Sequence, residues 1–278
     1  MKEKKETPAL LFLGGDRRMD AAAALFPGSR RLFGAGPPPS DAALAEALAG
    51  ADGIVLPLPG SRDKLTLHAP LCGDPPTLAA LFSGVKEKLV FAGSLPPERE
   101  KALESAGNRL LFYGQEEIFL RENASLTAEA LALRGILPPP GSPCGITGFG
   151  RVAKATAALC AAKGCPPILF CRRAEACREA ENAGYTALPL RALPHPILRE
   201  LPLLLNTVPA PILGARELAG FEGRYGELAF PGGLRDNALP EERILRLPGL
   251  PGLLPEAAGA ALAGAVRRLW EGEEELPC

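Results

Sequence analysis

A glycine-rich turn between an apolar run and a helical pattern is the first segment whose residue types and spacing suggest chemistry. Residues 144–164 read CGITGFGRVAKATAALCAAKG. Gly148 permits a tight turn, Gly150 lets backbone amides approach a pyrophosphate, and the small Ala153 lets the helix pack on the strand. We predict that the turn holds a dinucleotide at the positive end of the helix dipole, through Gly148, Phe149, Gly150, Arg151 and Val152. The alternative is a strand–helix turn without a ligand.

Two arginines occupy the position where a site for NAD carries an acidic residue. Arg172 and Arg173 lie 22 and 23 positions after Gly150, at the end of a predicted strand over 167–171. An acid there would bind the ribose 2′-hydroxyl and repel a 2′-phosphate, whereas guanidinium groups bind that phosphate. The expected cofactor is therefore NADP. The alternative is a pair of solvated arginines at a helix start.

A further polar segment, formed by Asn206, Thr207, Val208 and Pro209, ends a later predicted strand. Loops at the carboxyl ends of parallel strands line the ligand crevice of a doubly wound sheet. These four residues are therefore candidate cofactor contacts beside the nicotinamide ribose. An ordinary connection from strand to helix is the alternative.

Short apolar runs alternate with helical patterns along the chain and would position these residues. We expect strands over 10–13, 31–33, 53–58, 89–92, 109–113, 144–147, 167–171, 185–188, 203–207, 227–230 and 244–247. Helices are expected over 19–26, 40–49, 96–105, 115–135, 152–163, 175–183 and 256–270. Strands spaced by helices predict βαβ units. The predicted fold class is α/β, with two domains of Rossmann-like parallel sheet, flanking helices and a cleft between the domains.

A proline-rich stretch divides this alternation into two halves. Residues 135–141 read GILPPPG and stop a long helical pattern. We therefore expect an N-terminal α/β substrate or partner domain over 1–135 and a C-terminal NADP-binding, Rossmann-like domain over 136–278. The sequence leaves open whether the last helix crosses back to the first domain.

Composition narrows the class of protein. The 278 residues carry 31 Lys and Arg against 32 Asp and Glu, so no basic surface for nucleic acid or an anionic membrane is expected. Apolar runs are shorter than the about 20 residues that a membrane span needs, and the N-terminus lacks a leader pattern. These features favour a cytoplasmic protein. The seven cysteines include no C-x-x-C pair, so reduced thiols and no metal site are expected.

Short motifs spread over nearly the whole chain occur in an order that matches one known family. They are Leu13-Gly14-Gly15-Asp16 with Arg18, Ile54-Val55-Leu56-Pro57, Asn123 with Thr127 and Glu129, Gly148–Ala153, Asn206-Thr207-Val208-Pro209, Pro231-Gly232-Gly233, and Pro248-Gly249-Leu250-Pro251-Gly252 with Ala258-Gly259. On these motifs the chain resembles the A subunit of dipicolinate synthase, a sporulation protein of endospore-forming bacteria. The resemblance implies NADP-dependent oxidation of dihydrodipicolinate to dipicolinate in the cytoplasm of the mother cell. It also implies that the partner is a second, flavoprotein-like subunit, and a homo-oligomer is left open.

The chain departs from that family's pattern at several positions. Phe230 stands where a Ser or Arg precedes Pro-Gly-Gly, and Glu227 replaces an Asp. Pro255-Glu256-Ala257 replaces a Pro-Lys-Thr run, and Leu126 replaces a Pro. Loss of a lysine opposite a dicarboxylate would remove a cation. Two alternatives therefore stay open, another two-domain NADP-dependent dehydrogenase of a small carboxylate and a non-catalytic NADP-binding subunit.

The dicarboxylate that the resemblance implies needs fixed cations and a proton acceptor. Arg18, which follows the first predicted strand, is the first candidate cation, and Arg17 and Arg62 are weaker ones. The candidate catalytic base is Glu129 or Asp16. Asp16 has an alternative role as the N-cap of the helix that follows it.

Three further residues are candidate contacts for this substrate. Asn123 and Thr127 are i,i+4 neighbours on one helical face, and Gly252 belongs to the Pro-Gly-rich motif of the second half. The two histidines of the chain, His68 and His195, lie in proline-flanked segments. We expect both to be structural or solvent-exposed.

Overall fold

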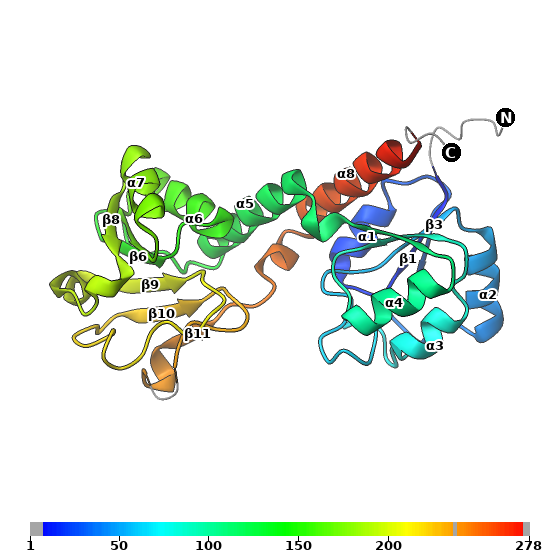
Figure 1. Ribbon diagram of the computed structural model, residues 1–278, viewed down its shortest axis with the longest axis horizontal. Helices are drawn as coiled ribbons and strands as arrows, with labels where there is room; N and C mark the ends of the chain where they lie inside the picture. The colour runs from blue at the N-terminus through cyan, green and yellow to red at the C-terminus, as the bar shows by residue number, and fades with distance from the viewer. Residues whose placement is uncertain (1–7, 236–237, 275–278) are drawn as a thin grey trace. The chain divides into compact units, whose positions relative to one another are not determined.

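In the computed structural model the chain forms two compact units, both drawn in Figure 1. The structure describes residues 8–235 and 238–274. Unit 1 combines Met1–Asn123 with Leu254–Cys278, and unit 2 is Ala124–Leu253. The last helix thus belongs with the first half of the chain. The division after Asn123 precedes the expected one at residue 135, since residues 124–135 make their contacts within unit 2.

Unit 1 is built on a five-stranded parallel sheet with the strand order β2-β1-β3-β4-β5. The strands are β1 (Leu10–Leu13), β2 (Arg30–Leu32), β3 (Gly53–Val55), β4 (Leu89–Ala92) and β5 (Arg109–Phe112). The helices are α1 (Arg17–Ala23), α2 (Asp41–Gly50), α3 (Leu78–Ser83), α4 (Pro97–Ser105), the first turns of α5 (Glu117–Leu133) and α8 (Pro255–Glu274), with a 3-10 turn at Tyr113–Gln115. The strand order reverses between β1 and β3, which makes their carboxyl ends the expected ligand crevice of this sheet.

The alternation of side chains along the strands gives unit 1 two apolar layers. Leu11 of β1 belongs to a buried cluster that includes side chains of α2, α3 and α4. On the opposite face Phe12 packs against Phe26, with ring centroids 5.7 Å apart, and Phe91 packs against Trp270 of α8 at 6.4 Å. Both faces of the sheet are covered, which explains why the central strands β1, β3 and β4 carry no polar side chain.

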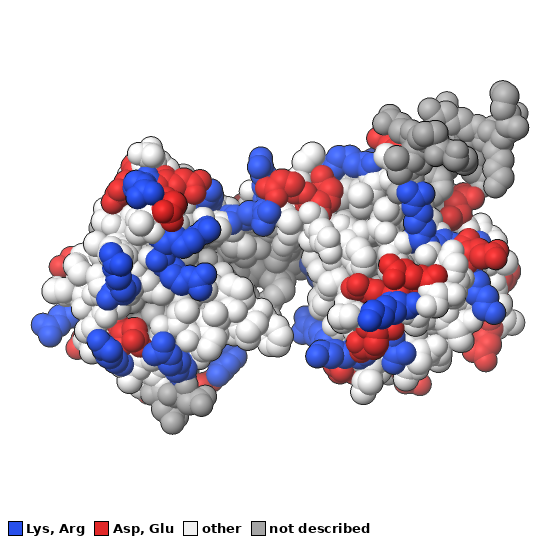
Figure 2. Space-filling model, in the orientation of Figure 1, with Lys and Arg blue, Asp and Glu red and all other residues white. Residues whose placement is uncertain are grey.

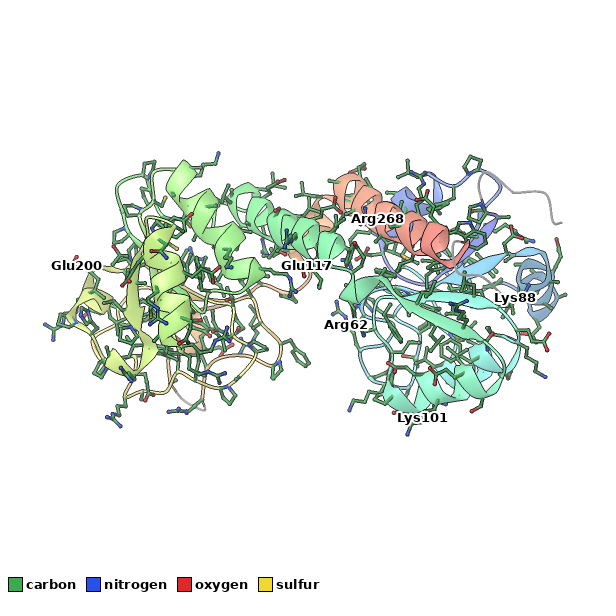
Figure 3. The ribbon with its side chains drawn as sticks, turned by 45° about the horizontal axis from the view of Figure 1, so that its top comes forward. Arg62, Lys88, Lys101, Glu117, Glu200 and Arg268 are labelled. Carbon is green, nitrogen blue, oxygen red and sulfur yellow. The ribbon has the colours of Figure 1, made fainter. Side chains whose placement is uncertain are left out.

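Small residues let α8 pack closely on α1. A Cβ added at Gly259 would lie 2.6 Å from the Ala21 Cβ and 2.8 Å from the Arg18 carbonyl oxygen, so a larger residue would separate the helices. Further along α8, Arg268, which is labelled in Figure 3, donates to the Glu116 carboxylate at 2.8 Å. Glu116 also accepts from two amides in the first turn of α5. The last helix is thereby fixed within unit 1 at both of these points.

Unit 2 is built on a six-stranded parallel sheet with the order β11-β10-β9-β6-β7-β8. The strands are β6 (Cys144–Thr147), β7 (Pro167–Cys171), β8 (Thr186–Pro189), β9 (Leu203–Asn206), β10 (Arg224–Glu227) and β11 (Ile244–Arg246). The helices are the rest of α5, α6 (Arg151–Ala162) and α7 (Ala174–Asn182), with 3-10 turns at Leu190–Ala192, Pro196–Glu200, Glu241–Arg243 and Leu250–Leu253. Counted from β6 this is the 3-2-1-4-5-6 order of a dinucleotide-binding sheet, with its switch point between β6 and β9.

The predicted fold class is confirmed, because both units are parallel α/β sheets flanked by helices. The cleft between the domains stays a prediction. α3 was not expected, and it begins after Thr77, whose hydroxyl accepts from the Ala80 amide at 3.2 Å. The strand expected over 227–230 is wrong, because β10 ends at Glu227. The carboxylate of Glu227 accepts the amides of Ala229 and Gly233, which turns the chain out of the sheet.

The surface charges, the helices and the cysteines of the described residues bear on the class of protein. Basic and acidic side chains are interspersed over the face drawn in Figure 2, with no continuous basic surface on it. Within residues 8–235 and 238–274, no helix is long and apolar enough to cross a membrane, and no group of His, Cys, Asp and Glu could hold a metal ion. The six described cysteines are free thiols, and Cys278 lies outside the described residues.

Candidate functional site

The turn between β6 and α6 leaves an open space in front of the helix. Gly148 has φ +83°, and a Cβ there would lie 2.9 Å from Val208 Cγ2, so the fold itself favours glycine. Gly150 has φ −81° and ψ −172°, which any residue adopts, and a Cβ there would meet no described atom within 4 Å. Gly150 is the N-cap of α6, and no side chain caps the first amides of the helix. Open space in front of uncapped amides fits a phosphate group.

The other predicted residues of this turn surround the same space. Phe149 is half-buried and packs edge-on against Tyr185, with ring centroids 6.3 Å apart. Lys154 Nζ lies 5.2 Å from the centre of the Phe149 ring. Arg151 is exposed and Val152 is half-buried in the first turn of α6. The turn is therefore supported from one side by aromatic packing and remains accessible at the helix N-terminus.

Two exposed arginines follow β7, the strand beside β6. Arg172 and Arg173 come directly after Cys171, and Arg173 is the N-cap residue of α7. Neither side chain forms an ion pair with any residue that the structure describes. Because β6 and β7 are parallel neighbours, the arginines and the glycine turn lie at the same edge of the sheet. Guanidinium groups without an ion pair at this position fit the 2′-phosphate of NADP.

A buried polar network joins the carboxyl ends of β6, β9 and β10. The Thr147 hydroxyl donates to Asn206 Oδ1, and Asn206 Nδ2 donates to Glu227 Oε1 at 2.7 Å. Thr147 and Asn206 are fully buried. The Thr207 hydroxyl donates to the Thr147 carbonyl at 2.7 Å. These bonds satisfy the buried polar atoms and fix the turn after β9 at the switch point, where Val208 lies against Gly148.

The Glu227 carboxylate organises the other side of this network. Besides Asn206, it accepts the Tyr225 hydroxyl at 2.7 Å and the Gly233 amide at 2.7 Å. Burial and the neighbouring Glu227 carboxylate raise the pKa of Tyr225, which keeps the phenol protonated. The loop that these bonds hold presents Phe230, whose side chain is 96% exposed. Pro209 of the neighbouring turn is also exposed.

In unit 1 the predicted cation Arg18 forms an ion pair with Asp16 just after β1. Arg18 Nε lies 2.8 Å from Asp16 Oδ1 and Nη2 lies 2.9 Å from Oδ2, with side chains 17% and 28% exposed. Asp16 is also the N-cap of α1 and accepts the Arg18 amide at 3.1 Å. Burial alone would raise the pKa of Asp16, but the hydrogen bonds and charge of Arg18 hold it below its ordinary value. Asp16 is therefore ionised at neutral pH and fills the capping role that the sequence left open.

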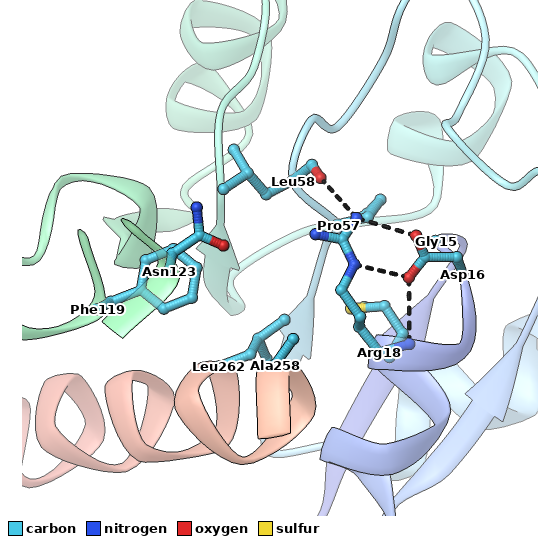
Figure 4. Close-up of a pocket in the computed structure, with 10 residues that line it drawn as sticks. Gly15, Asp16, Arg18, Pro57, Leu58, Phe119, Asn123, Ala258 and Leu262 are labelled. Carbon is cyan, nitrogen blue, oxygen red and sulfur yellow. Dashed lines mark hydrogen bonds and ion pairs between the residues drawn. The ribbon is translucent and has the colours of Figure 1, made fainter. Parts of the chain in front are cut away.

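The Asp16–Arg18 pair lines a small pocket within unit 1, drawn in Figure 4. Arg18 also lies 3.4 Å from the Leu58 carbonyl oxygen, and its Nη1 donates no hydrogen bond to a described residue. Asn123 of α5 and Leu262 of α8 contribute to the lining. The cavity has a volume of about 10 Å³, the space of one water molecule. It has room for a carboxylate oxygen, and the rest of a ligand would lie outside it.

Three predicted substrate residues belong to unit 2. Thr127 lies one turn after Asn123 on α5 and is buried, whereas Glu129 is exposed. Residues two positions apart in an α-helix differ by about 200° around its axis, so Glu129 points to the side of α5 opposite Thr127. Gly252 is half-buried in the 3-10 turn Leu250–Leu253. Their roles, and their convergence with Arg18 and the cofactor turn, stay predictions.

No protein-family model and no curated protein matches the sequence. Solved structures match it over nearly its whole length. The chain is similar to the dipicolinate synthase A subunit from Bacillus halodurans, with a TM-score of 0.77 and 20% identity over 94% of this chain and 97% of that one. The dipicolinate synthase A chain from Bacillus subtilis gives 0.76 and 19% over 96% and 97%. A transhydrogenase from Sinorhizobium meliloti gives 0.60 and 15% over 89% and 79%. At these identities the likeness shows the fold.

Three residues of these sites were not among the predicted ones. Thr147 and Glu227 both end strands at the carboxyl edge of unit 2, and a polar residue closing an apolar strand was the signal that could have found them. His68 lies beside the Gly14-Gly15 turn of unit 1, since its carbonyl accepts the Gly15 amide at 2.5 Å. No local pattern reveals that contact, because 53 positions separate the two residues.

Proposed function

We propose that the protein is an NADP-dependent oxidoreductase of the dipicolinate synthase A-subunit type, which oxidises dihydrodipicolinate to dipicolinate. One observation carries the proposal. The switch point of the unit 2 sheet combines an open glycine turn at Gly150 with two exposed arginines after β7. The fold of the whole chain is that of solved dipicolinate synthase subunits, and the family motifs of the sequence support the same substrate.

The residues of unit 2 fit NADP by their chemistry. The amides around Gly150 would bind the pyrophosphate, and Arg172 and Arg173 would bind the 2′-phosphate. The turn Asn206–Pro209 would contact the nicotinamide ribose at the switch point. NADP, when bound, supplies the acceptor for the hydride that the substrate loses. The protein holds the phosphates and keeps the turn after β9 rigid through Thr147 and its buried network.

Unit 1 supplies the proposed contacts for a carboxylate. Asp16 holds the Arg18 guanidinium in one orientation, so little side-chain entropy is lost when Nη1 binds a ligand. The same ion pair offsets the charge of Arg18, so a dicarboxylate needs a further cation. Asn123 of unit 1 and Thr127 and Gly252 of unit 2 are the proposed polar contacts, and Glu129 and Asp16 are the proton acceptors that the sequence predicted.

Two measurements on the purified protein test the proposal. Titration with NADP and with NAD should give a dissociation constant at least tenfold lower for NADP, which is about 1.4 kcal/mol. Freshly generated dihydrodipicolinate should then reduce NADP, followed by the absorbance of the reduced cofactor. Equal affinities for the two dinucleotides would contradict the assignment of Arg172 and Arg173.

The turnover measurement also separates the two alternatives. Reduction of NADP by another small carboxylate, without turnover of dihydrodipicolinate, would identify a different two-domain dehydrogenase. Tight NADP binding without turnover, by the chain alone or together with the flavoprotein-like partner, would identify a non-catalytic subunit. The proposed cytoplasmic location in the mother cell rests on the family resemblance. It requires that the flavoprotein-like subunit be found in the same compartment.

A further inference from the structure

A half-buried histidine is docked on the glycine turn of unit 1. The His68 carbonyl accepts the Gly15 amide at 2.5 Å, and the His68 amide donates to the Gly60 carbonyl at 2.9 Å. A Cβ at Gly14 would lie 2.9 Å from the same His68 carbonyl oxygen, so the loop and the turn are in close contact. The turn follows β1 and Gly60 follows β3. His68 is therefore held at the switch point of the unit 1 sheet, where a ligand crevice is expected.

The loop that carries His68 is ordered by its own hydrogen bonds. Asp63 Oδ1 accepts the amides of Leu65 and Thr66 at 2.8 Å, and Oδ2 accepts the Thr66 hydroxyl at 2.7 Å. Leu67 is buried and donates its amide to the Pro76 carbonyl at 3.0 Å. The backbone of His68 is thus fixed on both sides. Its ring nitrogens make no hydrogen bond within the described part of the chain, so they are open to exchange a proton with a ligand.

Charged groups on two neighbouring segments act on His68. Burial lowers the pKa of His68, and Arg62 and Arg18 lower it further, against the opposing effect of Asp16. Arg62 is exposed on the loop after β3, as Figure 3 shows, and Arg31 donates to the Gly15 carbonyl at 3.3 Å. The imidazole is therefore neutral at neutral pH and can accept a proton. Arg18 is paired with Asp16 and Arg31 with Asp20, so Arg62 is the cation beside His68 that forms no ion pair with a described residue and suits an anionic ligand.

The other candidates for the base are less suited to that role. The pKa of Asp16 lies below its ordinary value, and both of its oxygens are bonded to Arg18. A carboxylate held in that way is a weak base. Glu129 is exposed on the side of α5 opposite Thr127. His68 combines a fixed backbone, available ring nitrogens and nearby cations.

Resting on the proposed function, we propose that His68 is the proton acceptor of the oxidation and that Arg18 and Arg62 bind a carboxylate of the substrate beside it. NADP, when bound, would supply the acceptor for the hydride that leaves one ring carbon of the dihydropyridine. An imidazole nitrogen of His68 would take the proton from the adjacent ring carbon, and the electron pair of that C–H bond would become the new ring double bond. The imidazolium would then return its proton to water.

A titration of the two imidazoles by NMR tests the site without turnover. The chain holds only His68 and His195, so a His195→Asn variant assigns both signals. Saturating pyridine-2,6-dicarboxylate should raise the pKa of His68 by about one unit, a tenfold gain in proton affinity, because the dianion favours the imidazolium. His195 is the internal control, since it lies in unit 2 and its Nδ1 accepts the Ile197 amide at 3.2 Å. An unchanged His68, or an equal shift of both residues, would overturn the proposal.

Kinetics of His68→Gln test the role in the reaction. The variant should lose at least about 100-fold in kcat, as expected for removal of a general base, with a smaller change in KM. The wild-type kcat/KM should fall as the pH drops through the pKa of His68, which burial and the neighbouring arginines hold below the ordinary value of about 6.5, and this acid limb should be absent in the variant. Leu65→Ala is the matched control, because that exposed side chain lies on the same loop and should leave activity unchanged.

The outcomes separate this proposal from the function on which it rests. If the wild-type protein does not oxidise dihydrodipicolinate, the proposed function fails, and the titration still decides whether His68 borders a carboxylate site. If the wild-type protein is active and His68→Gln keeps both its rate and its acid limb, the assignment of His68 fails and the function stands. A His68→Gln variant that does not fold leaves the titration of the wild-type protein to decide.

Discussion

Both units end their first strand in a glycine turn, but the space in front of the two turns differs. In unit 1 both glycines have positive φ, and a Cβ at Gly14 would lie 2.7 Å from Leu67 while one at Gly15 would overlap Met19. In unit 2 a Cβ at Gly150 would meet no described atom within 4 Å. The protein fills the first turn with its own loop and helix and leaves the second open. This difference supports a dinucleotide site in unit 2 and argues against one at the same place in unit 1.

The charges at the two sheet edges differ in the same way. In unit 1 Arg18 is paired with Asp16, and Arg31 is paired with Asp20 at 2.8 Å. In unit 2 the two arginines after β7 are exposed and have no ion-pair partner among the described residues. Paired charges hold a fold in one geometry, whereas unpaired cations attract an anion. The two sheet edges thus differ in how their arginines are paired, and substitutions can test that contrast.

The largest expected effect is on the stability of unit 1. Gly15→Ala places a methyl group at φ +80° against Met19 and Pro57, so strain and overpacking together should cost about 3 kcal/mol. Gly28→Ala is a matched control, since Gly28 also has φ +80° but no described atom within 4 Å of its added Cβ. It should cost only the strain, about 1–2 kcal/mol. Chemical denaturation followed by the fluorescence of Trp270, the single tryptophan, measures both. Equal costs would contradict a filled turn.

The next effect is on binding in unit 2. Gly150→Val should weaken NADP binding at least 100-fold, about 2.7 kcal/mol, because the side chain enters the space left for the pyrophosphate. Its backbone angles suit valine, so the denaturation midpoint should stay that of the parent protein. Gly50→Val is the control, because its added Cβ also meets no described atom within 4 Å but lies in unit 1. If Gly150→Val binds NADP with the affinity of the parent protein, the turn has only a structural role.

A smaller effect is expected on the choice between cofactors. Replacing Arg172 and Arg173 together by Ala should remove a tenfold preference for NADP over NAD, about 1.4 kcal/mol, and leave NAD affinity unchanged. Arg178→Ala is the control, since Arg178 is exposed on α7 and pairs with Glu175 at 3.3 Å. Dissociation constants for both dinucleotides at one ionic strength give the ratio. If the double variant keeps its preference for NADP over NAD, other residues must bind the 2′-phosphate.

Local sequence signals predicted the parts of the fold that depend on local structure. The apolar strand Cys144–Thr147, the turn Gly148–Gly150 and the helix after it follow one another as expected, because turn chemistry and periodicity act over a few residues. Ser40 caps α2 as predicted, with its hydroxyl accepting the Ala43 amide at 3.2 Å. The α/β class follows from the same alternation.

Contacts between distant segments could not be predicted in this way. Even the ion pair between Arg18 and Asp16, two residues apart, was not predicted, because the sequence offered Asp16 only as a base or as an N-cap. The strand expected over 227–230 failed because the Glu227 carboxylate takes amides that a strand would use. His68 reaches the Gly15 turn through a loop whose path depends on tertiary packing. Long-range hydrogen bonds leave no period in the sequence.

The smallest expected effect separates the two roles of Asp16 in unit 1. Asp16→Asn keeps an N-cap for α1 but removes the charge that pairs with Arg18, so it should cost under about 1 kcal/mol at neutral pH. Asp16→Ala removes the cap as well and should cost about 1 kcal/mol more. Denaturation followed by Trp270 fluorescence measures both variants against the parent protein.

The pH dependence of the Asp16→Asn difference gives the sharper test. The pKa of Asp16 is lowered in the folded protein, so the ion pair stabilises the fold fully above the unfolded pKa of about 3.9 and loses its contribution as the pH falls through the lower folded value. The parent protein and Asp16→Asn should therefore converge in stability at acid pH and differ only above it. The double arginine variant in unit 2 should show no such convergence, because Arg172 and Arg173 are exposed and form no ion pair with a described residue. If Asp16→Asn were as stable as the parent at neutral pH, the pair would not hold the unit 1 turn, and Arg18 would be free to turn toward a ligand.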